Sequence, residues 1–207
     1  MHLQDALSDI AEIRASLDRN QTYRGFRSMA IGVSAIFVLI GGLVQMHSDL
    51  HRFPSRYLDI WLCVAVGSLV VTAIEMIVRG RVSNDLAVWK MHGKVASALL
   101  PSFLVGALVT AALVIETKQV VVLEQNNLWL LPGLWAMVYS LGLFSVCNLL
   151  HRATRFAALY FLIAGCTYLL INWTVRNVEA WHMIAIFGVG QLMLAFILYW
   201  KVERRRG

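Results

Sequence analysis

The chain has 207 residues, of which 59% are hydrophobic and 14% charged, whereas a soluble domain carries about 25% charged residues. The apolar residues form long runs rather than ten-residue stretches that alternate with polar residues, which argues against a soluble domain and against a transmembrane barrel. The net charge is +6, and because the basic residues are distributed by membrane side, we attribute this charge to membrane orientation and expect no nucleic-acid partner.

Six apolar runs of about 18 to 22 residues are each long enough to cross a hydrocarbon core of roughly 30 Å. The connections between them are short, so consecutive spans should form antiparallel hairpins. No cleavable signal pattern accompanies the first run, and we expect that helix to be retained. The sequence therefore predicts an all-α polytopic membrane protein, a bundle of six transmembrane helices over residues 29–46, 57–78, 95–115, 128–150, 156–173 and 182–200.

Lysine and arginine predict the direction of these spans. Fourteen of the 18 basic residues lie in the N-terminal segment, in the connections after the second and fourth runs, and in the C-terminal tail. Positive charge concentrates on the cytoplasmic side of membrane proteins, so we expect both termini in the cytoplasm and the chain in a bacterial cytoplasmic (inner) membrane. This divides the chain into a cytoplasmic helix (1–25), a six-helix transmembrane domain (26–200) and a basic cytoplasmic tail (201–207).

The N-terminal segment has the periodicity of an amphipathic helix. Its apolar stripe contains Leu3, Leu7, Ile10 and Leu17, and its acidic residues lie mostly off that stripe. Through residues 1–20 this helix would pack on the protein's own cytoplasmic loops or on a second copy, dock on a partner protein, or lie on the membrane surface. The acidic residues disfavour the last possibility, because helices that bind anionic lipid are rich in lysine and arginine.

Residues 83–97 predict a second, short helix on the cytoplasmic side, with Trp89, Lys90 and Lys94 suited to the lipid headgroup region. In the following run, Pro101 is a candidate kink.

Aromatic residues near the span ends indicate belts at the two membrane interfaces. The outer belt contains Tyr57, Trp61, Trp129, Trp173 and Trp181, and the inner belt contains Trp89, Tyr199 and Trp200. Three cysteines inside the spans lack metal-binding spacing and are expected to be buried free thiols, namely Cys63, Cys147 and Cys166.

Glu75 is an acidic residue inside the second run and has two interpretations. A carboxylate within a membrane span is a candidate ion or proton site. Its depth, however, is only about 4 to 5 Å from the cytoplasmic end of the span, and Arg79 follows in the order that favours an i, i+4 ion pair. An interfacial ion pair and a functional carboxylate both remain open.

Three further polar residues are candidates for a polar pathway or binding site. Gln191 lies near the middle of the sixth run, where an amide either links helices or lines a path. Asn148 and Arg152 lie at the cytoplasmic end of the fourth run and, together with Glu75, would form a shallow polar pocket on that side.

Histidines give only a weak metal signal. His47 and His51 are four residues apart, and His182 begins the sixth run on the same predicted side of the membrane, so three ligands would meet there around a metal. A single pair at this spacing does not define a site, and no two histidines lie at mid-membrane depth on separate spans, as a bis-histidine haem would require. We expect no metal and no cofactor. Motifs for nucleotide binding, hydrolysis and zinc proteolysis are absent from the sequence.

Two segments of the sequence carry a family resemblance: WLLPGLWAMVYSLGLFSV, residues 129–146, and SDIAEIRASLDRNQTYRGFR, residues 8–27. Together with Pro101 and Gly106, they resemble a family of uncharacterised bacterial multi-span membrane proteins. The resemblance implies a bacterial membrane location and assigns no activity to any residue.

These features predict a non-enzymatic membrane protein that acts through protein contacts, as a sensor, a regulator or an assembly subunit. The alternative is a small oligomeric transporter or channel that uses Glu75, Gln191 and Asn148. A third hypothesis is a membrane enzyme that acts on lipid or quinone.

Overall fold

The computed structural model describes residues 28–47, 54–83, 86–119, 127–150, 152–176 and 178–200. Regular structure in these ranges is helical, and six helical segments are long and apolar enough to cross a membrane, so the predicted all-α six-helix membrane bundle is confirmed. The predicted amphipathic helix (1–25) and basic tail (201–207) lie outside these ranges. The elements are α2 (Ser28–Met46), α3 (Pro54–Ser83), α4 (Leu86–Gln119), η1 (Asn127–Leu130), α5 (Leu131–Leu150), α6 (Thr154–Val175), α7 (Ala180–Met183), η2 (Ile184–Gly188) and α8 (Val189–Leu198).

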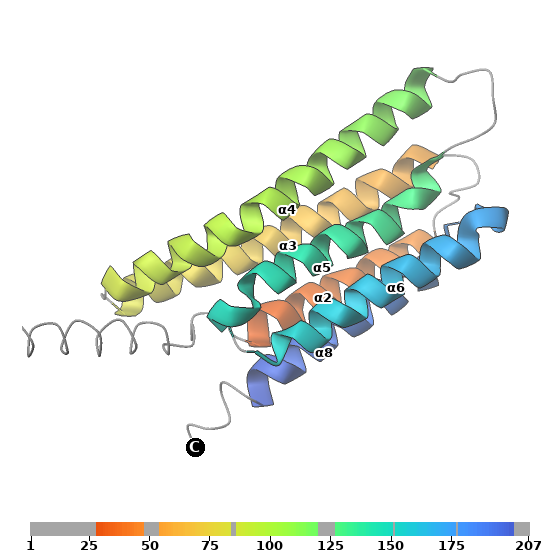
Figure 1. The fold of residues 1–207 in the computed structure, drawn as a ribbon. Helices are drawn as coiled ribbons and strands as arrows, with labels where there is room; N and C mark the ends of the chain where they lie inside the picture. Colours follow the sequence, from red (N-terminus) through yellow and green to blue (C-terminus); the bar gives the residue numbers. More distant parts are fainter. Residues whose placement is uncertain are drawn as a thin grey trace, which may run out of the picture.

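Four of the spans form a core, and two lie at its side. The core consists of α2, α5, α6 and the continuous α7–η2–α8 segment (Figure 1). Helix α3 packs on α2 and helix α4 on α5, whereas α3 and α4 make few contacts with each other. In the most apolar window of each span, 6% of positions are buried in α3 and none in α4, against 33–44% in the other four. We call α3 and α4 the two-helix arm.

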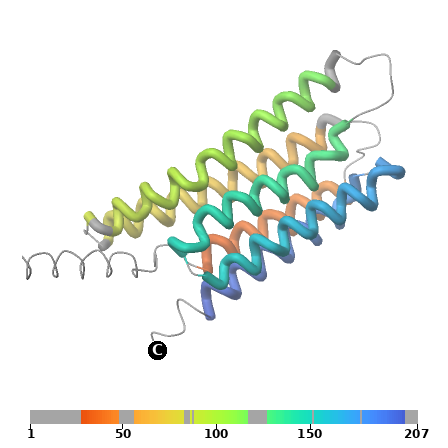
Figure 2. The backbone as a smooth tube through the Cα atoms, in the orientation of Figure 1, coloured from red at the N-terminus to blue at the C-terminus, as the bar shows by residue number. Residues whose placement is uncertain are grey.

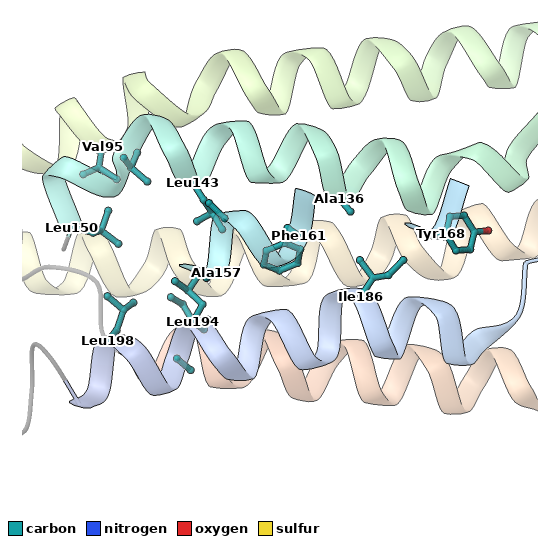
Figure 3. Close-up of a cluster of buried hydrophobic side chains, with 14 residues drawn as sticks. Val95, Ala136, Leu143, Leu150, Ala157, Phe161, Tyr168, Ile186, Leu194 and Leu198 are labelled. Atoms are coloured by element: carbon teal, nitrogen blue, oxygen red, sulfur yellow. The ribbon is translucent and has the colours of Figure 1, made fainter. Parts of the chain in front are cut away.

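The core is built around Phe161 of α6, which is fully buried. Around it lie aliphatic side chains from α5, α6 and α8, including Leu143, Ala157 and Leu194 (Figure 3). Close approach of α5 and α6 depends on small residues. A Cβ added at Gly165 would lie 2.8 Å from the carbonyl oxygen of Gly133, so these backbones pack at a distance that only glycine permits.

The two-helix arm is longer than the core helices. Helix α3 has 30 residues and α4 has 34, which corresponds to about 45 Å and 51 Å of helix. The other spans have between 19 and 24 residues. The tube view shows the ends of the arm at the α3–α4 connection projecting beyond the core helices (Figure 2). This end carries Arg79, and we call it the Arg79 end; the opposite end of the bundle, which carries His182, is the His182 end.

Three sequence expectations are corrected by the packing. The predicted short helix over 83–97 is not a separate element, because α4 begins at Leu86 and continues through Pro101 to Gln119. Among the predicted belt residues, Tyr57, Trp61 and Trp129 are buried inside the protein, although Trp173, Trp181 and the three aromatic residues predicted for the other belt are exposed. None of the three cysteines is fully buried, because Cys63 is exposed on α3 and Cys147 and Cys166 are partly exposed, while all three are free thiols.

Candidate functional site

The predicted ion pair of Glu75 forms on α3. Glu75 Oε1 lies 3.7 Å from Arg79 Nε, and the two side chains are 22% and 28% exposed. The next residue, Gly80, lies directly beneath the indole of Trp89 on α4, where an added Cβ would meet the ring at 2.6 Å. His92 is buried beside Trp89, so this contact also brings its ring to the end of α3 that carries Arg79. Sequence reasoning did not single out His92, since nothing in the sequence places α4 against Arg79.

The other predicted polar residues occupy different settings. Gln191 Nε2 donates to the hydroxyl oxygen of Tyr139 at 3.2 Å, a hydrogen bond from α8 to α5 in the middle of the bundle. Asn148 at the end of α5 and Arg152 after it are exposed. Asn148 faces outward because Val146 and Leu150 turn the opposite side of α5 into the core, and Arg152 lies in the turn that follows the helix.

The weak metal candidates also have distinct surroundings. His47 is exposed, and its Nδ1 lies 2.9 Å from the Leu43 carbonyl oxygen of its own helix. His51 lies outside the described residues. His182 is buried and is held in contacts with α6 and with the residues before α7. The described residues contain no group of three histidine, cysteine, aspartate or glutamate side chains that could hold a metal ion.

A set of buried polar side chains lies at the His182 end. Tyr168 Oη donates to the Trp129 carbonyl oxygen at 3.0 Å, which joins α6 to η1. Asn172, one turn later, donates to the Tyr168 carbonyl oxygen and lies 3.5 Å from His182 Nε2. Tyr168, Trp129 and Asn172 are each 4% exposed and His182 is 8% exposed. We call these four residues the His182 cluster.

A second hydrogen-bonded bridge lies beside this cluster. Gln45 near the end of α2 accepts a hydrogen bond from Trp61 Nε1 of α3 at 2.7 Å. Its own amide donates to the Val178 carbonyl oxygen at 3.2 Å, in the connection between α6 and α7. Gln45 therefore joins two helices and a connection through both ends of one side chain.

The start of α7 has a capping box in which histidine occupies the position usually taken by glutamate or glutamine. The backbone N–H of Glu179 donates to His182 Nδ1 at 3.2 Å, and the Glu179 side chain accepts from the backbone of His182. The Glu179 carboxylate also accepts from Trp181 Nε1 at 2.6 Å. The preceding helix α6 ends at Val175 and is capped by Arg176, whose φ of 51° is left-handed and whose backbone N–H donates to the Asn172 carbonyl oxygen. The connection is thus fixed at both of its ends.

The sixth span contains a π-helical segment, Ile184–Gly188, immediately after α7. The wider turn changes the partners of the backbone carbonyls, and Tyr160 Oη of α6 donates to the Ala185 oxygen at 2.5 Å. On the opposite side, Ile184 fills the space above Gly42, where an added Cβ would lie 2.5 Å from its Cδ1. This irregularity positions the His182 end relative to α2 and α6.

Two buried donors at this end have no hydrogen-bond partner among the described residues, namely Tyr57 Oη and Trp129 Nε1. Buried donors of this kind are normally satisfied by water or by a bound group. The spacing Glu179-x-x-His182 is the sequence signal that would have pointed to the capping box. No spacing in the sequence would have paired Gln45 with Val178, because the two residues are 133 positions apart.

Comparison of the chain with models of known protein families, with curated proteins and with solved structures finds no match.

Proposed function

We propose that this chain is a non-enzymatic protein of a bacterial cytoplasmic membrane that acts through protein contacts, as a sensor, a regulator or an assembly subunit. Both termini lie in the cytoplasm, in accordance with the distribution of lysine and arginine. The observation that carries the proposal is the two-helix arm, in which 6% of the positions in the most apolar window of α3 and none in that of α4 are buried. The resemblance of residues 129–146 to bacterial multi-span proteins supports the location.

One side of α4 suits contact with another transmembrane helix. Ser97, Leu104, Ala107 and Ala111 share an exposed face at helical spacing. Small residues let helix backbones approach closely in lipid, where packing rather than hydrophobicity drives association. The occupant of this face is a helix of a second copy or of a separate subunit, and residues 1–20 supply a further contact in the cytoplasm.

Two of the three polar side chains that the transporter alternative would use are engaged in contacts within the protein, while Asn148 is exposed. Gln191 is bonded to Tyr139, and Glu75 is paired with Arg79. These contacts support a structural role for both residues and favour the contact protein over the transporter alternative.

The test is native mass spectrometry of the protein extracted in its own lipids. We expect a second copy or a distinct copurifying subunit. Ala107→Trp on the exposed face of α4 should reduce the assembled fraction, whereas Leu170→Trp, which places the same indole at an exposed position of α6, should leave it unchanged. Deletion of residues 1–20 should weaken the assembly without unfolding the bundle. A stable monomer that ignores all three changes would contradict the proposal.

A further inference from the structure

The capping box at α7 depends on the protonation state of one side chain. Because a backbone N–H can only donate, the bond from Glu179 to His182 Nδ1 requires that nitrogen to carry no proton. A protonated imidazole has two N–H donors and no acceptor. Protonation of His182 therefore removes this bond and turns one N–H donor toward another.

We propose that His182 is a proton-responsive latch that holds the connection between α6 and α7 closed when neutral and releases it when protonated. In the neutral state Nδ1 accepts from Glu179 and Nε2 carries the proton, so the 3.5 Å contact between Nε2 and Asn172 Nδ2 brings two donors together and is not a hydrogen bond in this tautomer. In the protonated state both ring nitrogens donate, and the Glu179 carboxylate, which belongs to the same capping box, is the acceptor that the ring then turns toward. The two states therefore use different parts of Glu179, its backbone and its carboxylate.

Among the described residues, the elements packed against the His182 ring bring uncharged groups to it, so the Glu179 carboxylate is the charged group beside the ring. Helix α6 presents Tyr168, whose ring lies edge-on at 5.0 Å, and the uncharged amide of Asn172. On its own helix, Trp181 lies against the ring at 3.9 Å. Helix α2, which also packs on α7, contributes the uncharged Gln45 bridge, and its terminal His47 faces Leu43 on its own helix.

Release of the connection between α6 and α7 would also affect α2 and α3, which are joined to it through hydrogen bonds. Val178, next to Glu179, supplies the carbonyl that holds the Gln45 amide, and the same Gln45 accepts from Trp61 of α3. Movement of residues 178–179 would free the amide of Gln45, whose oxygen accepts from Trp61, and would loosen the attachment of α3 to α2. The latch therefore couples the proton concentration at the His182 end to the position of α3. In the proposed orientation this end faces away from the cytoplasm.

Two substitutions separate the latch from an ordinary cap. Glutamine at this position can accept the Glu179 N–H through its amide oxygen and does not titrate, so His182→Gln should remain closed at every pH. Alanine has no acceptor, so His182→Ala should be open at every pH. The wild-type protein should change from one behaviour to the other between about pH 8 and about pH 5.

The experiment is amide hydrogen exchange, read by mass spectrometry, on the full chain in lipid nanodiscs. Rates for peptides that cover residues 176–184 are corrected for the intrinsic effect of pH. From pH 8 to pH 5 the wild type should lose about fivefold protection, the size expected for loss of one helix cap, while His182→Gln loses none. Peptides from α5 serve as the internal control.

Equal pH dependence in the wild type and in His182→Gln would overturn the proposal, as would constant protection in the wild type. If His182→Ala does not fold, the comparison of the wild type with His182→Gln still decides the question.

Discussion

The contact between Phe161 and Gly190 provides the sharpest test of the core. A Cβ added at Gly190 would lie directly against Cζ of Phe161 and 2.6 Å from its Cε1. The Phe161 ring cannot shift away from the added methyl group, because the rings of Tyr139, Tyr160 and Phe187 surround it. Their centroids lie 4.8, 5.7 and 5.7 Å from its own centroid. Gly190→Ala should therefore destabilise the protein by overpacking, at a cost of about 1–3 kcal/mol.

Phe161→Ala should destabilise the protein for the opposite reason, by leaving a cavity. In soluble proteins such a change costs about 3–5 kcal/mol, part of which is the transfer of apolar surface to water. Lipid is as apolar as the protein interior, so in a membrane mainly the packing part remains, and we expect about 2–3 kcal/mol. In the double variant the new methyl group occupies part of the space that the ring vacates. Its cost should be lower than the sum of the two single costs by about 1–2 kcal/mol.

The assay is the free energy of unfolding, obtained by titrating SDS into mixed micelles, for the four members of the double-mutant cycle. A control cycle combines Phe161→Ala with Gly80→Ala, which is overpacked against Trp89 on the arm and shares no neighbour with Phe161. In that control cycle the stability costs of the two single substitutions should add up to the cost of the double substitution to within about 0.5 kcal/mol. Additivity in the Gly190 cycle as well would refute the argument that a confined aromatic ring sets the glycine requirement on α8.

Three further predictions use the same unfolding measurement. Gln45→Leu should cost about 1–2 kcal/mol, because the buried Trp61 Nε1 loses its acceptor; an unchanged stability would show that this bridge carries no net energy. Ser140→Ala removes a 2.7 Å hydrogen bond to the Ala158 carbonyl oxygen across α5 and α6 and should cost about 0.5–1.5 kcal/mol, whereas Ser145→Ala, on the exposed side of α5, should stay within about 0.5 kcal/mol of the wild type. Glu75→Gln should change stability by less than about 0.5 kcal/mol and leave proton flux into proteoliposomes unaltered; loss of a pH-dependent flux would instead support the transporter alternative.

The tryptophans illustrate why location along a span does not determine environment. Trp61 and Trp129 lie near span ends, and such positions are typical of interfacial belts. Both side chains are buried, because the helix face that each one occupies points into the bundle, whereas Trp173 and Trp181 point outward. Which way a helix face points depends on its neighbours, and the neighbours are arranged by packing between segments far apart in the chain.

Glu75 and Gln45 show which polar contacts can be predicted from the sequence and which cannot. The pairing of Glu75 with Arg79 was predictable, because residues four apart on a helix are neighbours whatever surrounds them. The bridge made by Gln45 was not, because its partners come from α3 and from the connection before α7. The proposed site at the His182 end consists mainly of contacts of this second kind.

What the sequence determined by itself is the number of spans, since hydrophobic length must match the bilayer irrespective of tertiary contacts. The two helices of the arm extend beyond the predicted runs. The sequence also predicts the membrane orientation, which rests on the distribution of lysine and arginine. Only the tertiary structure decided that α2, α5, α6 and α8 form the core, that α3 and α4 stand aside as an arm, and that His182 caps a helix beside Asn172. The physical reason is that lipid and protein interior are equally apolar. Hydropathy therefore shows that a segment lies in the membrane. Close packing and hydrogen bonds between distant segments decide which face of that helix the rest of the protein covers.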